Sequence, residues 1–95
     1  MTKITADAIY QRSPSATYQT VAGEAIVIDL NTGSYFSLNE TGTWLWEHLD
    51  GQRSVAELAR ELAEVCGVPE QAATVQEDAL ELVSNLARET LVVSR

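Results

Sequence analysis

Few residues of this chain could do acid–base, nucleophilic or metal chemistry, and they form no recognisable set. His48 is the only histidine and Cys66 the only cysteine. A metal site or a general base needs partners at a suitable spacing, and neither residue has them in the sequence. We interpret His48 as a surface or helix-end residue, because a helix C-terminus favours a partly protonated imidazole. We interpret Cys66 as a small core residue.

Carboxylates are the remaining candidates, and they fall into two groups on predicted helices. These are Glu57, Glu61 and Glu64 beside Arg60, and then Glu77, Asp78 and Glu81. Paired carboxylates hydrolyse glycosides only when a cleft holds them around the bond, and one helix face makes no cleft. We expect a solvated surface with modest ion pairing instead. The glycines show no phosphate-binding spacing. The sequence therefore predicts a protein that is not an enzyme and has no metal site and no cofactor.

Composition narrows the classes of partner. The 95 residues suffice for one domain with a small core. Fourteen acidic residues against six basic ones give a formal charge of −8, which argues against nucleic-acid binding, because phosphate contacts need cations. No apolar run approaches the ~18 residues of a membrane span, and the first residues lack the apolar segment of a signal peptide. We expect a cytoplasmic protein with no membrane contact, and the single cysteine agrees with a reducing compartment.

Three strands are predicted in the first half of the chain. They span residues 17–22, 24–30 and 34–38, with turns at Ala22-Gly23 and Asn31-Thr32-Gly33. In the middle strand Ile26, Ile28 and Leu30 share one face, and Ala25, Val27 and Asp29 share the other. The pattern predicts an antiparallel meander. Residues 1–16 show weak periodicity and are expected to form a loosely ordered arm outside the domain at 17–95, with Ile4, Ile9 and Tyr10 docking onto it.

The second half is predicted to be helical. A first helix over 40–50 begins at the N-cap Asn39, and a second begins at the capping box formed by Ser54 and Glu57. A third helix starts at Pro69 and extends to about Glu89, followed by a short extended tail over 91–93. The fold class is therefore α+β: a three-stranded antiparallel sheet followed by three helices, which is winged helix-turn-helix-like.

Two tryptophans on the first helix cannot both face inward. Trp44 and Trp46 are two positions apart, which is about 200° around a helix. We expect one of them in the core. The other is either covered by the N-terminal arm or available to a partner.

One indication of function comes from the position of a predicted strand in the sheet. The strand over 34–38 should lie at an edge of the meander, and it contains no proline and no charge to block pairing. Such an edge can accept a peptide as an added strand. The same pattern is equally compatible with an edge that is covered by the N-terminal arm or by a second copy of the chain.

The chain resembles the PqqD-like family, the recognition elements for precursors of ribosomally made, post-translationally modified peptides (RiPPs). The likeness covers about residues 17–93. It rests on Tyr35, Leu38 and Asn39, then Trp46 and Asp50-Gly51, then Ser54-Val55 and Glu57-Leu58, and finally Asp78 and Leu86. Thr90 stands where the family often has glycine, and the run from Gly67 to Asp78 is a residue or two longer than in the family.

The resemblance implies a domain that binds the leader segment of a precursor peptide and presents it to a separate maturation enzyme. That enzyme would be a leader protease or cyclase, as for lasso peptides, or a radical-SAM enzyme, as in PQQ biosynthesis. The leader would add as an antiparallel strand to the third strand, beside the third helix. Carried over, the peptide-binding residues would be Ser34, Tyr35, Phe36, Ser37, Leu38, Val75, Asp78, Ala79, Leu82 and Val83, with Glu77 as an alternative to Asp78.

A second hypothesis is a winged-helix regulator or a self-associating module. A DNA reader would place Lys or Arg on its recognition helix, but the second helix has only Arg60, with Arg53 before it, and the third has only Arg88. A homodimer paired through the open edge is harder to exclude from the sequence.

Overall fold

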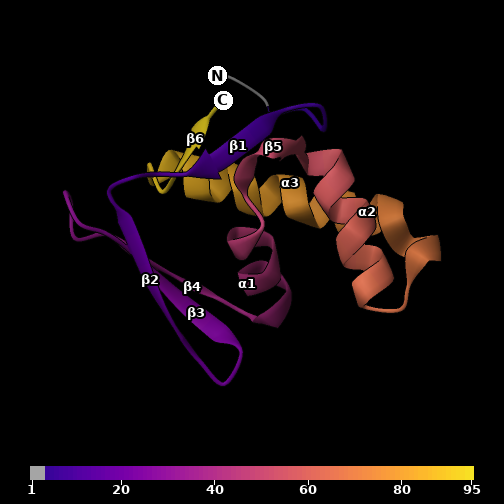
Figure 1. Cartoon of the computed structure of the whole chain (residues 1–95), viewed down its shortest axis with the longest axis horizontal. Helices are drawn as coiled ribbons and strands as arrows, with labels where there is room; N and C mark the ends of the chain where they lie inside the picture. The colour runs from indigo at the N-terminus through magenta and orange to yellow at the C-terminus, as the bar shows by residue number, and fades with distance from the viewer. Residues whose placement is uncertain (1–3) are drawn as a thin grey trace.

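The computed structural model describes residues 4–95. In this part of the chain four strands precede the first helix, and the other helices and strands follow it (Figure 1). In order they are β1 (Ile9–Arg12), β2 (Ala16–Val21), β3 (Glu24–Asp29), β4 (Tyr35–Leu38), α1 (Glu40–Glu47), β5 (Asp50–Ser54), α2 (Val55–Val65), α3 (Ala72–Arg88) and β6 (Val92–Ser94), with a 3₁₀ turn over Pro69–Gln71. The predicted α+β class, with a three-stranded antiparallel sheet followed by three helices, is confirmed.

The predicted meander is one of two sheets, with the strand order β2-β3-β4. Ala22 and Gly23 connect β2 to β3 with φ values of 54° and 82°, and two successive positive φ values make the tight turn that suits a twisted hairpin. The inner face of β3 carries Ala25, Val27 and Asp29, all buried, whereas Ile26 and Ile28 on the outer face are exposed. The alternation seen in the sequence is therefore real, and the face with the smaller residues is the one that packs.

The second sheet, in the order β5-β1-β6, contains the main difference from the sequence prediction. A loosely ordered arm was expected over residues 1–16, but residues 9–12 form β1, the central strand of this sheet. Its partners lie about forty and eighty residues further along the chain, so no local pattern could reveal the pairing. Ile4 and Tyr10 pack against the core as expected, and residues 1–3 lie outside the described part of the chain.

The first two helices begin at the predicted caps, whereas the first ends earlier and the third begins later than expected. Asn39 Oδ1 accepts from the N–H of Gly42 at 2.8 Å, and both hydrogen bonds of the Ser54–Glu57 capping box are present. The first helix ends at Glu47 rather than Asp50, because residues 50–54 turn outward to pair with β1. The third α-helix starts at Ala72, since Pro69–Gln71 forms only a 3₁₀ turn.

The core lies between the inner face of β2-β3-β4 and the three helices. Its largest fully buried side chains are Trp46, Leu45, Leu49, Leu58, Leu86, Leu91, Val27, Val55 and Val83. Trp46 meets the ring of Tyr18 edge-on, and Trp44 stacks on His48 with ring centroids 3.9 Å apart. One tryptophan is thus core, as expected, and the other is covered by the helix-end histidine. Cys66 is exposed at the C-cap of α2, so its assignment to the core was wrong.

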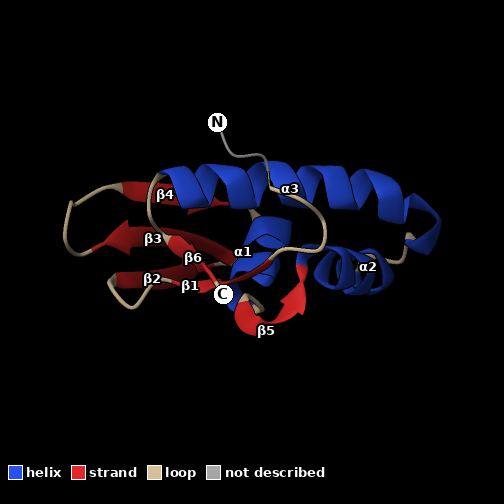
Figure 2. Cartoon of the chain, turned by 90° about the horizontal axis from the view of Figure 1, so that it is seen from above, coloured by secondary structure: helices blue, strands red, loops and turns tan. Residues whose placement is uncertain are grey.

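Figure 2 shows α3 running along one side of the molecule, with β4 next to its C-terminal part. None of the described helices is long and apolar enough to cross a membrane.

Candidate functional site

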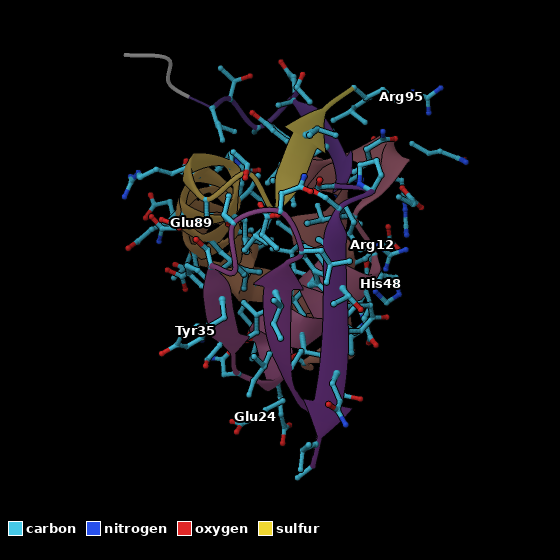
Figure 3. The ribbon with its side chains drawn as sticks, turned by 90° about the vertical axis from the view of Figure 1, so that its left-hand side faces the viewer. Arg12, Glu24, Tyr35, His48, Glu89 and Arg95 are labelled. Atoms are coloured by element: carbon cyan, nitrogen blue, oxygen red, sulfur yellow. The ribbon has the colours of Figure 1, made fainter. Side chains whose placement is uncertain are left out.

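The edge of β4 is free of any strand in the described part of the chain. β4 is the last strand of β2-β3-β4, and its only strand neighbour is β3. Residues 9–12, from the segment considered as a cover for this edge, belong to the other sheet, where β1 lies between β5 and β6. Figure 3 shows β4 at the outer margin of the sheet, with Tyr35 pointing away from it.

The pairing register decides which main-chain groups of β4 face outward. Asp29 N–H donates to the carbonyl of Ser34 at 2.8 Å, so these residues form a hydrogen-bonded pair. In an antiparallel ladder such pairs alternate, which makes Val27–Phe36 the next hydrogen-bonded pair. The N–H and C=O groups of Phe36 therefore point to β3. Those of Tyr35 and Ser37 point to the open edge, where a visiting strand would find them.

Side-chain hydrogen bonds fasten both ends of β3, the strand paired with β4, to the body of the protein. At the Leu38 end the buried Thr43 of α1 accepts from the N–H of Ala25 at 2.9 Å. At the other end the buried carboxylate of Asp29 accepts from the hydroxyl of Thr90, which follows α3, at 2.8 Å. Because these anchors tie the sheet to α1 and to the end of α3, the spacing between β4 and α3 is held by side-chain hydrogen bonds as well as by packing.

Asp29 is held as a carboxylate by its neighbours. The hydroxyl of Thr90 and the N–H of Asn31 keep the pKa of Asp29 below its ordinary value of 3.8, against a smaller opposing effect of burial. Thr90 has a φ of 58°, a left-handed conformation that favours glycine. The hydrogen bond to Asp29 gives a physical reason for a threonine at a position where the resemblance led us to expect glycine.

A pocket of about 440 Å³ opens where α1, α2 and α3 meet, next to the Leu38 end of β4. It is lined by Asn39, Thr41, Gly42, Leu45, Leu62, Cys66, Val68, Val75, Asp78, Ala79 and Leu82. The lining is mostly apolar, and the exposed Asp78 is its only charged residue. Such a concavity suits an apolar side chain of a ligand, with a carboxylate at the rim to meet a basic or polar group.

The structure brings together most, though not all, of the residues named from the sequence. Val75, Asp78, Ala79 and Leu82 line the pocket, but Val83 is fully buried in the core. Glu77, the alternative to Asp78, is exposed and does not line the pocket.

Sequence reasoning missed the pocket walls from α1 and α2. One signal was available: Gly42 stands inside a helix, where a Cβ would lie 3.3 Å from Leu82 Cδ2. Its small size lets α3 approach α1 at the pocket.

The site offers surfaces for binding, and few side chains near it could take part in other chemistry. Among residues 4–95, no three His, Cys, Asp or Glu side chains are grouped to hold a metal ion. The ring of His48 is engaged with its own helix, where Nδ1 lies 2.7 Å from the carbonyl oxygen of Trp44. What the arrangement offers is an unpaired strand edge beside an apolar pocket.

These features define a small winged-helix-type recognition domain with an open strand edge. Comparison with known proteins gives the family: the model for "Coenzyme PQQ synthesis protein D (PqqD)" matches residues 24–92. The chain belongs to the PqqD family, whose members include the RiPP recognition elements to which the sequence resemblance pointed.

Two solved structures share the fold. The first is described as "TbiB1 in Complex with the TbiA(beta) Leader Peptide", with 23% identity, a TM-score of 0.75, and coverage of 86% of this chain and 93% of that one. The second is "Lasso peptide synthetase B1 complexed with the leader peptide", with 19% identity, a TM-score of 0.74, and coverage of 88% and 96%. At these identities the likeness shows the fold. The search of curated proteins found no match.

Proposed function

We propose that this protein is a non-catalytic recognition element that binds the leader segment of a ribosomally made precursor peptide and delivers it to a separate modifying enzyme. The observation that carries the proposal is the unpaired edge of β4 beside the pocket formed by α1, α2 and α3. Family membership supports it, as do the two similar structures, each described as a complex with a leader peptide.

The leader binds by strand addition, antiparallel to β4. Its main chain exchanges hydrogen bonds with Tyr35 and Ser37, and its side chains alternate between the inner and the outer face of the sheet. At the Leu38 end an apolar leader side chain enters the pocket against Val75, Ala79 and Leu82. A segment of about ten residues with two or three buried anchors reaches micromolar to nanomolar affinity at such a preformed site.

The test uses peptides, because the cognate precursor is unidentified. The TbiA(β) leader serves as the first probe, and a random peptide library displayed on phage and selected on the protein supplies others. Titration into isotope-labelled protein should perturb the amides of Tyr35, Ser37 and the pocket face of α3. Changes confined to α1 and α2, with β4 unaffected, would contradict the proposal.

Self-association is the second candidate, and a specific observation favours it: β2 and β4 are both edge strands of one sheet. A second copy could use either edge for pairing. Sedimentation velocity at low micromolar concentration distinguishes self-association from peptide recognition, since the recognition element is expected to be monomeric at this concentration without its peptide.

A further inference from the structure

The outer face of the β2-β3-β4 sheet is apolar, and nothing in the described part of the chain covers it. Its exposed residues come from all three strands and the end of β3: Val21 is 69% exposed, Ile26 48%, Ile28 39%, Leu30 68% and Tyr35 72%. On β3, Ile26, Ile28 and Leu30 occupy every second position, and Ile28 lies opposite Tyr35, whereas Val21 lies at the other end of this face, opposite Glu24. We call these five residues the outer patch. The core uses the opposite face of the sheet, so the fold does not account for it.

The outer patch differs in charge from the rest of the molecule. The chain has a formal charge of −8, yet none of the five residues is charged. The other residues on this face are Thr17, Gln19, Ser37 and Glu24, and Glu24 lies opposite Val21 at the start of β3. Figure 3 looks onto this face, with Glu24 at its lower end, Glu89 above β4 and Arg12 beside the upper end of β2. An apolar face on a chain of charge −8 fits a partner that has an apolar surface bordered by Lys and Arg.

The direction of an added leader connects this patch to the proposed function. A strand antiparallel to β4 runs from the Leu38 end to the Tyr35 end. A leader precedes the segment to be modified, so that segment would leave the groove at the Tyr35 end. Tyr35 and Leu30, the two exposed residues beside the turn between β3 and β4, are found there. An enzyme seated on the outer patch would receive the substrate where the strand ends.

We propose that the outer patch is the docking surface for the modifying enzyme, which contacts the sheet face while the leader occupies the neighbouring edge. This inference rests on the proposed leader-binding function. A second copy of the chain is the less favourable occupant, because two chains of −8 repel each other. The enzyme should therefore present a basic border, and its binding should weaken as ionic strength rises.

The test compares a double substitution on the patch with a matched control elsewhere. Ile26→Thr/Ile28→Thr keeps β-branched residues on β3 and leaves its buried face unchanged. Val65→Thr makes the same kind of change at an aliphatic residue of α2 that is 65% exposed. The enzyme probes are the purified transglutaminase-like protease and the radical-SAM maturase, whichever is encoded beside this chain, measured by calorimetry with and without a selected peptide. Thermal unfolding verifies that each variant is folded.

The double variant should weaken enzyme binding by about tenfold or more, whereas Val65→Thr should stay within about twofold. Peptide affinity should be unchanged in both, because Ile26 and Ile28 lie on the middle strand and do not provide the pairing edge. Equal enzyme affinity of the double variant and the wild type would overturn the inference. So would failure of the encoded enzyme to bind the wild type, or a homodimer that the double variant abolishes. Failure of the proposed function is seen separately, as absence of peptide binding to the wild type.

Discussion

The most direct test of strand addition is a proline at Ser37. Its N–H points away from β3, so replacing it by proline removes one hydrogen-bond donor from the open edge and puts the ring where a leader strand would lie. The internal pairs Asp29–Ser34 and Val27–Phe36 are untouched. Proline is tolerated on edge strands whose N–H side faces solvent, so the fold should survive.

The expected loss follows from one main-chain hydrogen bond. Its net contribution is about 1 kcal/mol, and the leader carbonyl left without a donor adds a penalty in the range of about 1–3 kcal/mol, part of which water recovers. A total of about 1.5–3 kcal/mol corresponds to a Kd increase of roughly ten- to a hundredfold. Fluorescence anisotropy with a labelled, library-selected peptide measures this range directly.

Two further variants make the result decisive. Ser37→Ala changes only an exposed side chain, and its Kd should stay within about twofold of the wild type. Phe36→Pro removes an N–H that points to β3, so it should lower Tm rather than act on the peptide alone. If Ser37→Pro bound the peptide as tightly as Ser37→Ala, with both proteins folded, β4 would not be the pairing edge.

Three other outcomes follow from features of the site and fold. Val75→Phe should fill part of the 440 Å³ pocket and weaken peptide binding by about tenfold while leaving Tm nearly unchanged, measured by anisotropy and calorimetry. The folded-state pKa of Asp29 is depressed, so its contribution to stability is present above pH 3.8 and is lost as pH falls through the folded-state value. Thr90→Ala should lower Tm at pH 7 more than at pH 3, and Thr90→Ser, which keeps the hydroxyl, should retain most of the stability. Ser54→Ala removes the N-cap of α2 and should cost about 1 kcal/mol in urea denaturation, with Ala56→Ser as a control outside the cap.

Turns, strand alternation and helix caps act over a few residues, so the elements that depend on them could be predicted from the sequence. The β2–β4 meander was predicted to within about two residues at each end, because turns such as Ala22-Gly23 and strict alternation in β3 are short-range features. The caps of α1 and α2 were predicted for the same reason, since Asn39 and Ser54 act within one helical turn.

Strands that depend on distant partners were not predictable in this way. β5 has the polar sequence DGQRS, and it is a strand only because β1 pairs with it. β1 pairs with β6 as well, so the start and the end of the described chain stabilise one sheet together. This tertiary pairing, absent from any local window, is why the N-terminal segment was expected to be a loose arm.

The candidate site likewise combines features that the local sequence predicts with features that depend on tertiary packing. The edge position of β4 follows from the order of three consecutive strands and was predicted. The pocket needs three helices in a particular packing, and no local pattern indicates how α3 is rotated about its axis. Val83 was therefore assigned to the groove although it faces the core, while Leu45 and Leu62 were not named as pocket residues. That the remaining residues bind peptide stays a prediction.

The two open edges of β2-β3-β4 have a consequence for handling the protein. The β4 edge of one copy could join the β2 edge of the next, and this head-to-tail contact uses different surfaces and need not close into a ring. At high ionic strength, where the repulsion between chains of −8 is screened, concentrated peptide-free samples would then grow into open-ended ribbons. A peptide seated on β4 would terminate each ribbon, so the ligand would also serve as an inhibitor of polymerisation.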